Sequence, residues 1–267
     1  MTELNLMYFV TFLYNEGFSA DTVKSYLSAA RYTQISLGFG DSSVAGMPKL
    51  ELVIKGLKKR TATRQSHARL PVTPEILRAL KKVWEDDANR KKAVMLWAAV
   101  CMCFFSFLHS GEVVVPTDSG YDKTVHLSYC DVRVDSTVNP QYLEVRIKVS
   151  KTDPFRKGVT VYLGRADGDR CPVSAVLAYM VQRGPDKGPF FWFTKDRFLT
   201  QEWLVTAMRA ALGQAGLDSR KYAGHSFRIG AATTTARSSL LDSLIKTLGR
   251  WESAAYTVPK GDIMFSS

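Results

Sequence analysis

The feature that most constrains this chain is the apolar run AVMLWAAVCMCFFSFL at residues 93–108. The run is shorter than the ~20 residues that a membrane-spanning helix needs. It follows Arg90, Lys91 and Lys92, and polar residues come directly after it. A helix that is apolar on every side has to be covered by other elements. The run therefore predicts a helix buried on all sides in a large domain, and we expect no membrane partner.

The bulk composition agrees with a protein that builds such a core. The chain has 267 residues, of which 46% are hydrophobic and 23% charged, which is enough for one large domain or two ordinary ones. Its formal net charge of +11 favours a polyanionic partner such as nucleic acid or an anionic membrane surface. No two cysteines form a CxxC pair, so we expect no metal site. The four cysteines, which fit a reducing compartment, are Cys101, Cys103, Cys130 and Cys171.

The N-terminal part of the chain predicts a small helical domain. Residues 4–13, 19–35 and 50–60 are predicted helices, and Ser19 is placed to cap the second. Glycines and a proline between residues 38 and 48 separate the second helix from the third. We expect this domain to cover residues 1–66.

A basic segment, KGLKKRTATRQSHAR at residues 55–69, joins this domain to the rest of the chain and contains no acid. Such a run is often a solvated basic face or a linker. Because it lies between two predicted domains of a basic chain, it is also a candidate for contacts with a phosphate backbone. Its candidate residues are Lys55, Lys58, Lys59, Arg60, Arg64 and Arg69.

Residues 67–267 predict a second domain that contains a small antiparallel sheet. Residues 124–134 are one candidate strand, and residues 143–149 alternate between apolar and charged side chains. Residues 158–164 follow after a polar tip, so the last two segments predict a hairpin. The basic residues of that tip are Lys151, Arg156 and Lys157.

The remainder of the second domain is predicted to be helical. Thr73, Pro74 and Glu75 have the residue types that begin a helix. From Pro172 onward the pattern is helical again: Thr200 precedes one helix, another begins near position 225, and another covers residues 240–248. The fold class we expect is mainly α with a small antiparallel β-sheet (α+β).

His225 and Arg228 lie three residues apart, so both side chains are expected on one face of a helix. An arginine grips two oxygens of a phosphate while an imidazole donates or accepts a proton. The small residues Gly230, Ala231 and Ala232 would let this helix approach its neighbours closely. Taken alone, the pair is also typical of solvated helix positions, and its companions along the chain decide between these interpretations.

Those companions give the chain a family resemblance. HSFRIGAATT followed by IKTLGRW, supported by FFSFLHSGE, SKTDPFRKGV and YLSAAR, resembles the tyrosine recombinase (phage integrase) family. The resemblance covers nearly the whole length and is strongest to integrase-like proteins of eukaryotic mobile elements. It implies a helical core-binding (SAM-like) DNA-binding domain at residues 1–66 and a catalytic domain at residues 67–267.

The resemblance also implies a reaction and its partners. A tyrosine attacks a backbone phosphate of double-stranded DNA and forms a 3′-phosphotyrosine link, with no metal or other cofactor. Self-association on DNA, as a dimer or tetramer, is implied as well. We expect a nuclear location in a eukaryotic cell and a cytoplasmic one otherwise.

Several catalytic positions of the family carry over to this chain. Arg228 matches the second arginine and His225 its partner base. Trp251 matches the late tryptophan or histidine that packs on the phosphate. Lys151 lies at the hairpin tip, where the acid that protonates the leaving group belongs; a solvated turn lysine is the alternative.

Two positions depart from the family pattern. The family has Arg-x-x-Glu where this chain has His109 before Glu112, and it has a tyrosine near the position of Pro259. Tyr256 is a candidate substitute nucleophile, with core packing as the alternative. We therefore expect impaired strand cleavage. The alternative functions are a non-catalytic DNA-binding protein derived from a mobile-element recombinase and, with less support, a protein-interaction adaptor.

Overall fold

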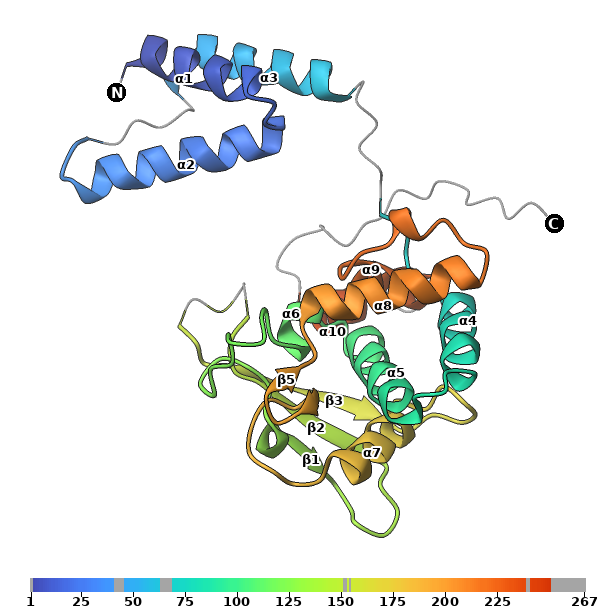
Figure 1. Ribbon diagram of the computed structural model, residues 1–267. Helices are drawn as coiled ribbons and strands as arrows, with labels where there is room; N and C mark the ends of the chain where they lie inside the picture. The colour runs from blue at the N-terminus through green and yellow to red at the C-terminus, as the bar shows by residue number, and fades with distance from the viewer. Residues whose placement is uncertain are drawn as a thin grey trace. The chain divides into compact units, whose positions relative to one another are not determined.

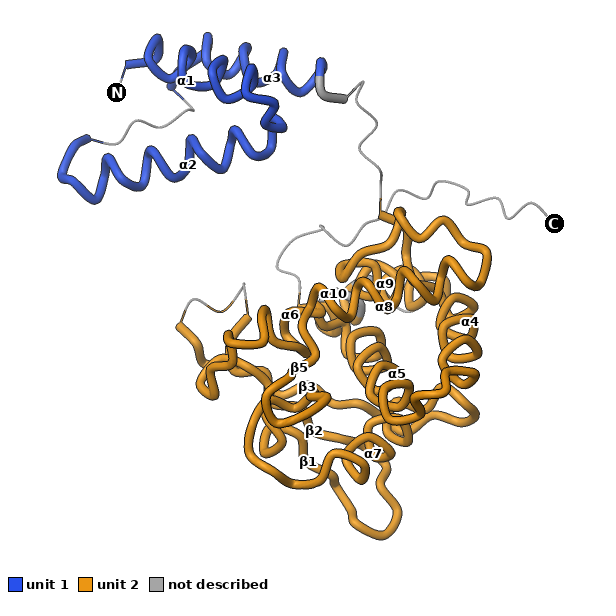
Figure 2. Tube along the Cα trace, in the orientation of Figure 1, with its two compact units in different colours: residues 1–67 blue, residues 68–267 orange. Residues whose placement is uncertain are grey.

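The chain divides into two compact units, residues 1–67 and 68–267 (Figure 1; Figure 2). The computed structural model describes residues 2–40, 46–62, 69–150, 153, 155–238 and 241–250. This division lies one residue from the boundary expected between residues 66 and 67. The roles expected for the two units, DNA binding and catalysis, stay predictions.

In the described residues of the first unit, the helices are α1 (Glu3–Asn15), α2 (Ala20–Ser36) and α3 (Pro48–Ala62). The Ser19 side chain caps α2 by accepting a hydrogen bond from Thr22 N, as its position predicted. One apolar face of each helix meets the others in a small core. The buried residues of that core are Leu6, Val10, Leu13, Ala20, Val23, Leu27, Leu50, Ile54 and Leu57.

Helix α5 (Arg90–Phe105) forms the centre of the second unit, and most of its side chains are buried. It packs against α4 (Pro74–Glu85), α7 (Pro172–Arg183) and α9 (Ser226–Arg237) (Figure 1). The buried helix expected from the apolar run is therefore confirmed. In the described part of the chain, no helix is both long enough and apolar enough to cross a membrane.

The three-stranded antiparallel sheet has the order β1-β2-β3, with β1 at Val132–Val134, β2 at Tyr142–Ile147 and β3 at Val159–Gly164. Strands β2 and β3 form the predicted hairpin, and Leu143 lies opposite Leu163 in their register. The apolar side chains of β2 are buried, as their alternation indicated.

The strand expected over residues 124–134 is wrong for most of that range, since the strand itself covers Val132–Val134. Residues Tyr129–Asp131 form a 3₁₀ turn, η2, in which the Asp131 carboxylate accepts a hydrogen bond from Ser128 N at 2.8 Å. The Lys148 ammonium group pairs with Asp131 at 2.5 Å. These polar contacts hold the segment in a turn in place of a strand.

A second small hairpin interrupts the region that was expected to be helical from Pro172 onward. Strands β4 (Trp192–Thr194) and β5 (Arg197–Phe198) pair antiparallel. The Arg183 side chain at the end of α7 fixes the approach to this hairpin by donating hydrogen bonds to four backbone carbonyl groups. The other elements described in the second unit are α6 (Ser110–Val113), α8 (Gln201–Gln214), η3 (Ser219–Lys221) and α10 (Asp242–Gly249).

Candidate functional site

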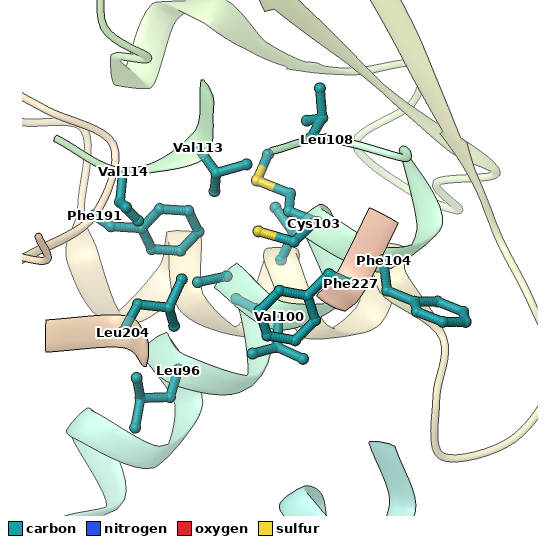
Figure 3. Close-up of a cluster of buried hydrophobic side chains, with 14 of the residues drawn as sticks. Leu96, Val100, Cys103, Phe104, Leu108, Val113, Val114, Phe191, Leu204 and Phe227 are labelled. Atoms are coloured by element: carbon teal, nitrogen blue, oxygen red, sulfur yellow. The ribbon is translucent and has the colours of Figure 1, made fainter. Parts of the chain in front are cut away.

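Helix α9 is anchored at its start by apolar packing and by a close contact with another segment. Phe227 is fully buried and belongs to the apolar cluster that includes Val100 and Phe104 of α5 (Figure 3). A Cβ atom at Gly230 would lie 1.9 Å from the carbonyl oxygen of Val72, so only glycine fits there. The close approach expected from the small residues of this helix is thus present, and it fixes the start of α9.

A second glycine brings α6 and α9 together. A Cβ atom at Gly224 would lie 2.2 Å from the Oγ atom of Ser110, the first residue of α6. The residues next to these two, His109 and His225, occupy the N-cap positions of their helices. The absence of a side chain at Gly224 therefore lets two histidines far apart in the sequence come into contact.

The two imidazole rings are stacked, with centroids 4.8 Å apart and planes inclined by 18°. Their Nδ1 atoms lie 3.3 Å apart, so in the hydrogen bond one ring donates and the other accepts. Partial burial of the ring and the nearby Arg228 guanidinium lower the pKa of His225. His225 is therefore expected to be neutral at pH 7 and to gain charge in acid.

Arg228 lies in the first turn of α9, and its side chain is buried. Its Nη2 atom donates a hydrogen bond to the backbone carbonyl of Gly249, at the end of α10. Burial and the like charge of Arg250 lower the pKa of Arg228. This arrangement concentrates positive charge in a place with little solvent.

An ion pair that the sequence did not predict completes the site. The Nη2 atom of Arg250 lies 3.0 and 3.2 Å from the two carboxylate oxygens of Glu112. Glu112 also accepts a hydrogen bond from the backbone N–H of His109 at 2.8 Å. Arg250 belongs to the LGRW motif, in which the family resemblance points to the neighbouring tryptophan. We call His109, Glu112, His225, Arg228 and Arg250 the His–Arg cluster.

The Arg250 guanidinium keeps part of its hydrogen-bonding capacity. Its Nε and Nη1 atoms are buried and have no acceptor among the described residues. A buried donor in that condition typically costs about 1–3 kcal/mol unless a ligand or water accepts its hydrogen bond. These atoms therefore point to a site for a negatively charged group.

Of the predicted catalytic residues, the structure brings His109, His225 and Arg228 together. Three others, Lys151, Trp251 and Tyr256, lie outside the described residues, as do Pro259 and Arg64. No group of three or more His, Cys, Asp or Glu that could hold a metal ion occurs in the described ranges. The catalytic role of each residue stays a prediction.

The other predicted DNA-binding residues are exposed. Lys55, Lys58, Lys59 and Arg60 lie on α3, where Lys58 approaches Asp21 at 3.9 Å. Arg69 is exposed in the second unit, although its Nη1 atom donates to the carbonyl of Arg220 at 2.8 Å. The exposed pair at the β2–β3 tip is Arg156 and Lys157.

Comparison with known proteins gives one curated relative and several solved structures. No family model matches the sequence. The chain is 23% identical over 226 residues to an integrase/recombinase XerD homolog of Selenomonas ruminantium, covering 82% of this chain and 61% of that protein. The chain thus spans about three fifths of the length of this relative.

Two solved structures are similar over 95% of the chain. One is the XerH site-specific recombinase bound to a palindromic difH substrate, with a TM-score of 0.63, 19% identity and 66% of that chain covered. The other is the Tn1549 transposon integrase in complex with circular intermediate DNA, with a TM-score of 0.56, 12% identity and 78% covered. This chain therefore has the tyrosine-recombinase fold, which confirms the predicted fold class and the resemblance to tyrosine recombinases. The finer likeness to proteins of eukaryotic mobile elements stays a prediction.

Proposed function

We propose that this chain is a DNA-binding protein of the site-specific recombinase and integrase type, and that its His–Arg cluster holds one backbone phosphate of duplex DNA. The observation that carries the proposal is that His109 meets His225 and Arg228, although His109 and His225 lie 116 positions apart in the sequence. A buried guanidinium beside an imidazole pair suits an anion with several acceptor oxygens.

Two further observations support duplex DNA as the partner. The net charge of +11 gives the chain a general attraction to polyanions. The similar XerH and Tn1549 structures are themselves complexes with DNA. We propose that the exposed cations of α3 and of the β2–β3 tip contact neighbouring phosphates, and that the protein self-associates on DNA.

Strand cleavage is proposed to be impaired. The side chain of His109 is shorter than the arginine of the family and lacks its planar fork. Loss of one donor that stabilises charge in the transition state typically lowers a rate by ~10²–10³. Pro259 also carries no nucleophile in place of the family tyrosine. A non-catalytic DNA-binding protein is the second candidate function, and these two substitutions are the observation that favours it.

A single selection experiment tests both candidates. A pool of labelled random-sequence duplexes is bound at low salt, and the complexes are then treated with SDS, with Tyr256→Phe run in parallel. We expect binding that weakens steeply with salt and no adduct that survives SDS. A surviving adduct that Tyr256→Phe abolishes would show a working recombinase with Tyr256 as its nucleophile. Binding that does not respond to salt would contradict the proposal as a whole.

A further inference from the structure

Arg250 has a backbone conformation that is unusual for its residue type. Its φ angle is 55°, in the left-handed region, directly after α10 ends at Gly249. Non-glycine residues occupy this region infrequently, and such residues often lie at functional sites. The preceding carbonyl, that of Gly249, accepts the hydrogen bond of Arg228. The turn therefore places the Arg250 side chain next to Arg228.

Glu112 fixes the orientation of the Arg250 guanidinium. Both carboxylate oxygens contact the Nη2 atom, and the carboxylate is itself held by the backbone N–H of His109. The side chains of Arg250 and Glu112 are only 16% and 11% exposed, so this ion pair is largely shielded from water. A guanidinium held at one corner in this way can present its remaining N–H groups to a ligand.

The net charge of the cluster favours the binding of one negatively charged group. Arg228 and Arg250 are both positive, Glu112 is the one acidic member, and the lowered pKa of His225 favours its neutral form at pH 7. With ordinary ionisation states, the cluster therefore has a net charge of about +1. A phosphodiester carries one negative charge and offers two unbridged oxygens that can accept hydrogen bonds from two arginines.

We propose that Arg250 is a second arginine ligand of the DNA phosphate, that it supplies the guanidinium lacking at position 109, and that Glu112 positions it. The inference rests on the proposed binding of DNA by this site. The donor that is missing at position 109 is thereby assigned to Arg250, 141 positions later in the chain. Neither the sequence motifs nor the family pattern placed a donor there.

The first test measures affinity for a selected duplex against salt concentration. Arg250→Gln is expected to weaken binding at low salt by roughly 10–100-fold. It should also reduce the slope of log affinity against log salt by about 0.9, the value for one phosphate contact. Arg78→Gln on α4 removes the same charge at an exposed position and is the matched control, for which we expect little change. Equal effects of the two variants would overturn the inference.

The second test asks whether position 109 can replace Arg250. Adding His109→Arg to Arg250→Gln should recover much of the lost affinity, because a guanidinium returns to the same cluster. A purely structural role of Arg250 in the Glu112 ion pair predicts no recovery. If Arg250→Gln does not fold, Arg250→Lys keeps the positive charge and loses the planar fork, and we expect it to bind severalfold more weakly than the wild type with an unchanged salt slope. Wild-type affinity in that variant would overturn the inference.

Glu112→Gln tests whether Glu112 acts on DNA affinity through its charge or by positioning Arg250. Removing a negative charge from the site should strengthen DNA binding if Glu112 acts by charge alone. If Glu112 positions Arg250, the same substitution should weaken binding, while the temperature of unfolding shows whether the fold persists. Tighter binding by Glu112→Gln would contradict the positioning role. Failure of the wild type to bind DNA would instead reject the proposed function, so the two failures are distinguishable.

Discussion

The cations of the His–Arg cluster are largely shielded from solvent and fixed by other groups, whereas those of α3 are exposed to solvent. Arg228 is buried and its guanidinium is fixed by a backbone carbonyl, and Arg250 is fixed by Glu112. The four α3 cations that are candidates for DNA contacts, Lys55, Lys58, Lys59 and Arg60, are exposed on a helix whose apolar face is occupied by the core of the first unit. Exposed cations attract any polyanion, whereas a fixed and desolvated pair can select the geometry of a phosphate. We therefore expect the two regions to contribute differently to DNA binding.

The largest expected effect comes from removing the close packing that forms the cluster. Gly230→Ala would place a methyl group 1.9 Å from the carbonyl oxygen of Val72, so the backbone has to shift. We expect the free energy of unfolding to fall by about 3 kcal/mol or more. Urea denaturation provides the measurement, and DNA binding should be lost with the fold.

Gly213→Ala is the matched control for Gly230→Ala. Gly213 lies within α8, and no atom lies within 4 Å of the position of an added Cβ. Gly213→Ala should therefore stabilise the protein by roughly 0.5–1 kcal/mol, because alanine favours the helix. Similar effects of the two substitutions would show that α9 does not depend on the close contact with Val72.

The next effect distinguishes the fixed cations from the exposed ones. Arg228→Lys keeps the charge but loses the planar fork, and we expect affinity for a selected duplex to fall by roughly tenfold or more. Lys59→Arg on α3 also keeps the charge and changes only the shape of the group, so it should leave affinity nearly unchanged. Fluorescence anisotropy measures both. Equal responses would remove the distinction between the two regions.

Removal of the exposed charges should mainly change how DNA affinity depends on salt concentration. Substitution of Lys55, Lys58, Lys59 and Arg60 by glutamine is expected to lower the salt slope by about 0.9 for each phosphate that α3 no longer neutralises. The weakening should be similar for different duplex sequences, because interactions with the backbone carry no sequence information. Strong dependence of the weakening on duplex sequence would instead assign base recognition to α3.

The smallest expected effect is the response of His225 to pH. The folded state holds the pKa of His225 below its ordinary value, so the unfolded chain binds more protons in that range. This contribution to stability is present above the ordinary pKa, and it is lost as pH falls below about 6.5 toward the folded value. DNA affinity should change in the opposite direction, because protonation adds positive charge to the cluster.

Thermal unfolding and anisotropy between pH 8 and pH 5.5, at constant ionic strength, measure the two trends. His225→Gln should flatten both, because glutamine cannot gain a proton in this range. Affinity that falls in acid for the wild type would show that the histidine pair does not face the bound phosphate.

Much of the fold could be predicted because its signals are local. Thr73 and Thr200 cap the helices that they were expected to begin, and the alternation in β2 gave the buried face of the sheet. The predictions that were wrong depended on distant partners. Lys148 and Asp131 hold the segment before β1 in a turn, and Arg183 organises the loop before β4. Local propensity contains no information about such contacts.

The candidate site was predictable to the extent that its residues lay in motifs. His225 and Arg228 were found through their spacing, and His109 through the glutamate that follows it. Arg250 was missed because its place depends on a left-handed backbone turn and on an ion pair with Glu112, 138 residues earlier. Only the folded chain brings these two features together.

The central claim is that the His–Arg cluster holds one particular phosphate. The most direct measurement uses a selected duplex in which each phosphate in turn is replaced by a neutral methylphosphonate. We expect one position to weaken wild-type binding far more than the others. Arg228→Gln, once thermal unfolding shows that it is folded, should no longer respond to that position. A loss spread evenly along the duplex, and identical in the wild type and Arg228→Gln, would show that the cluster does not hold one particular phosphate.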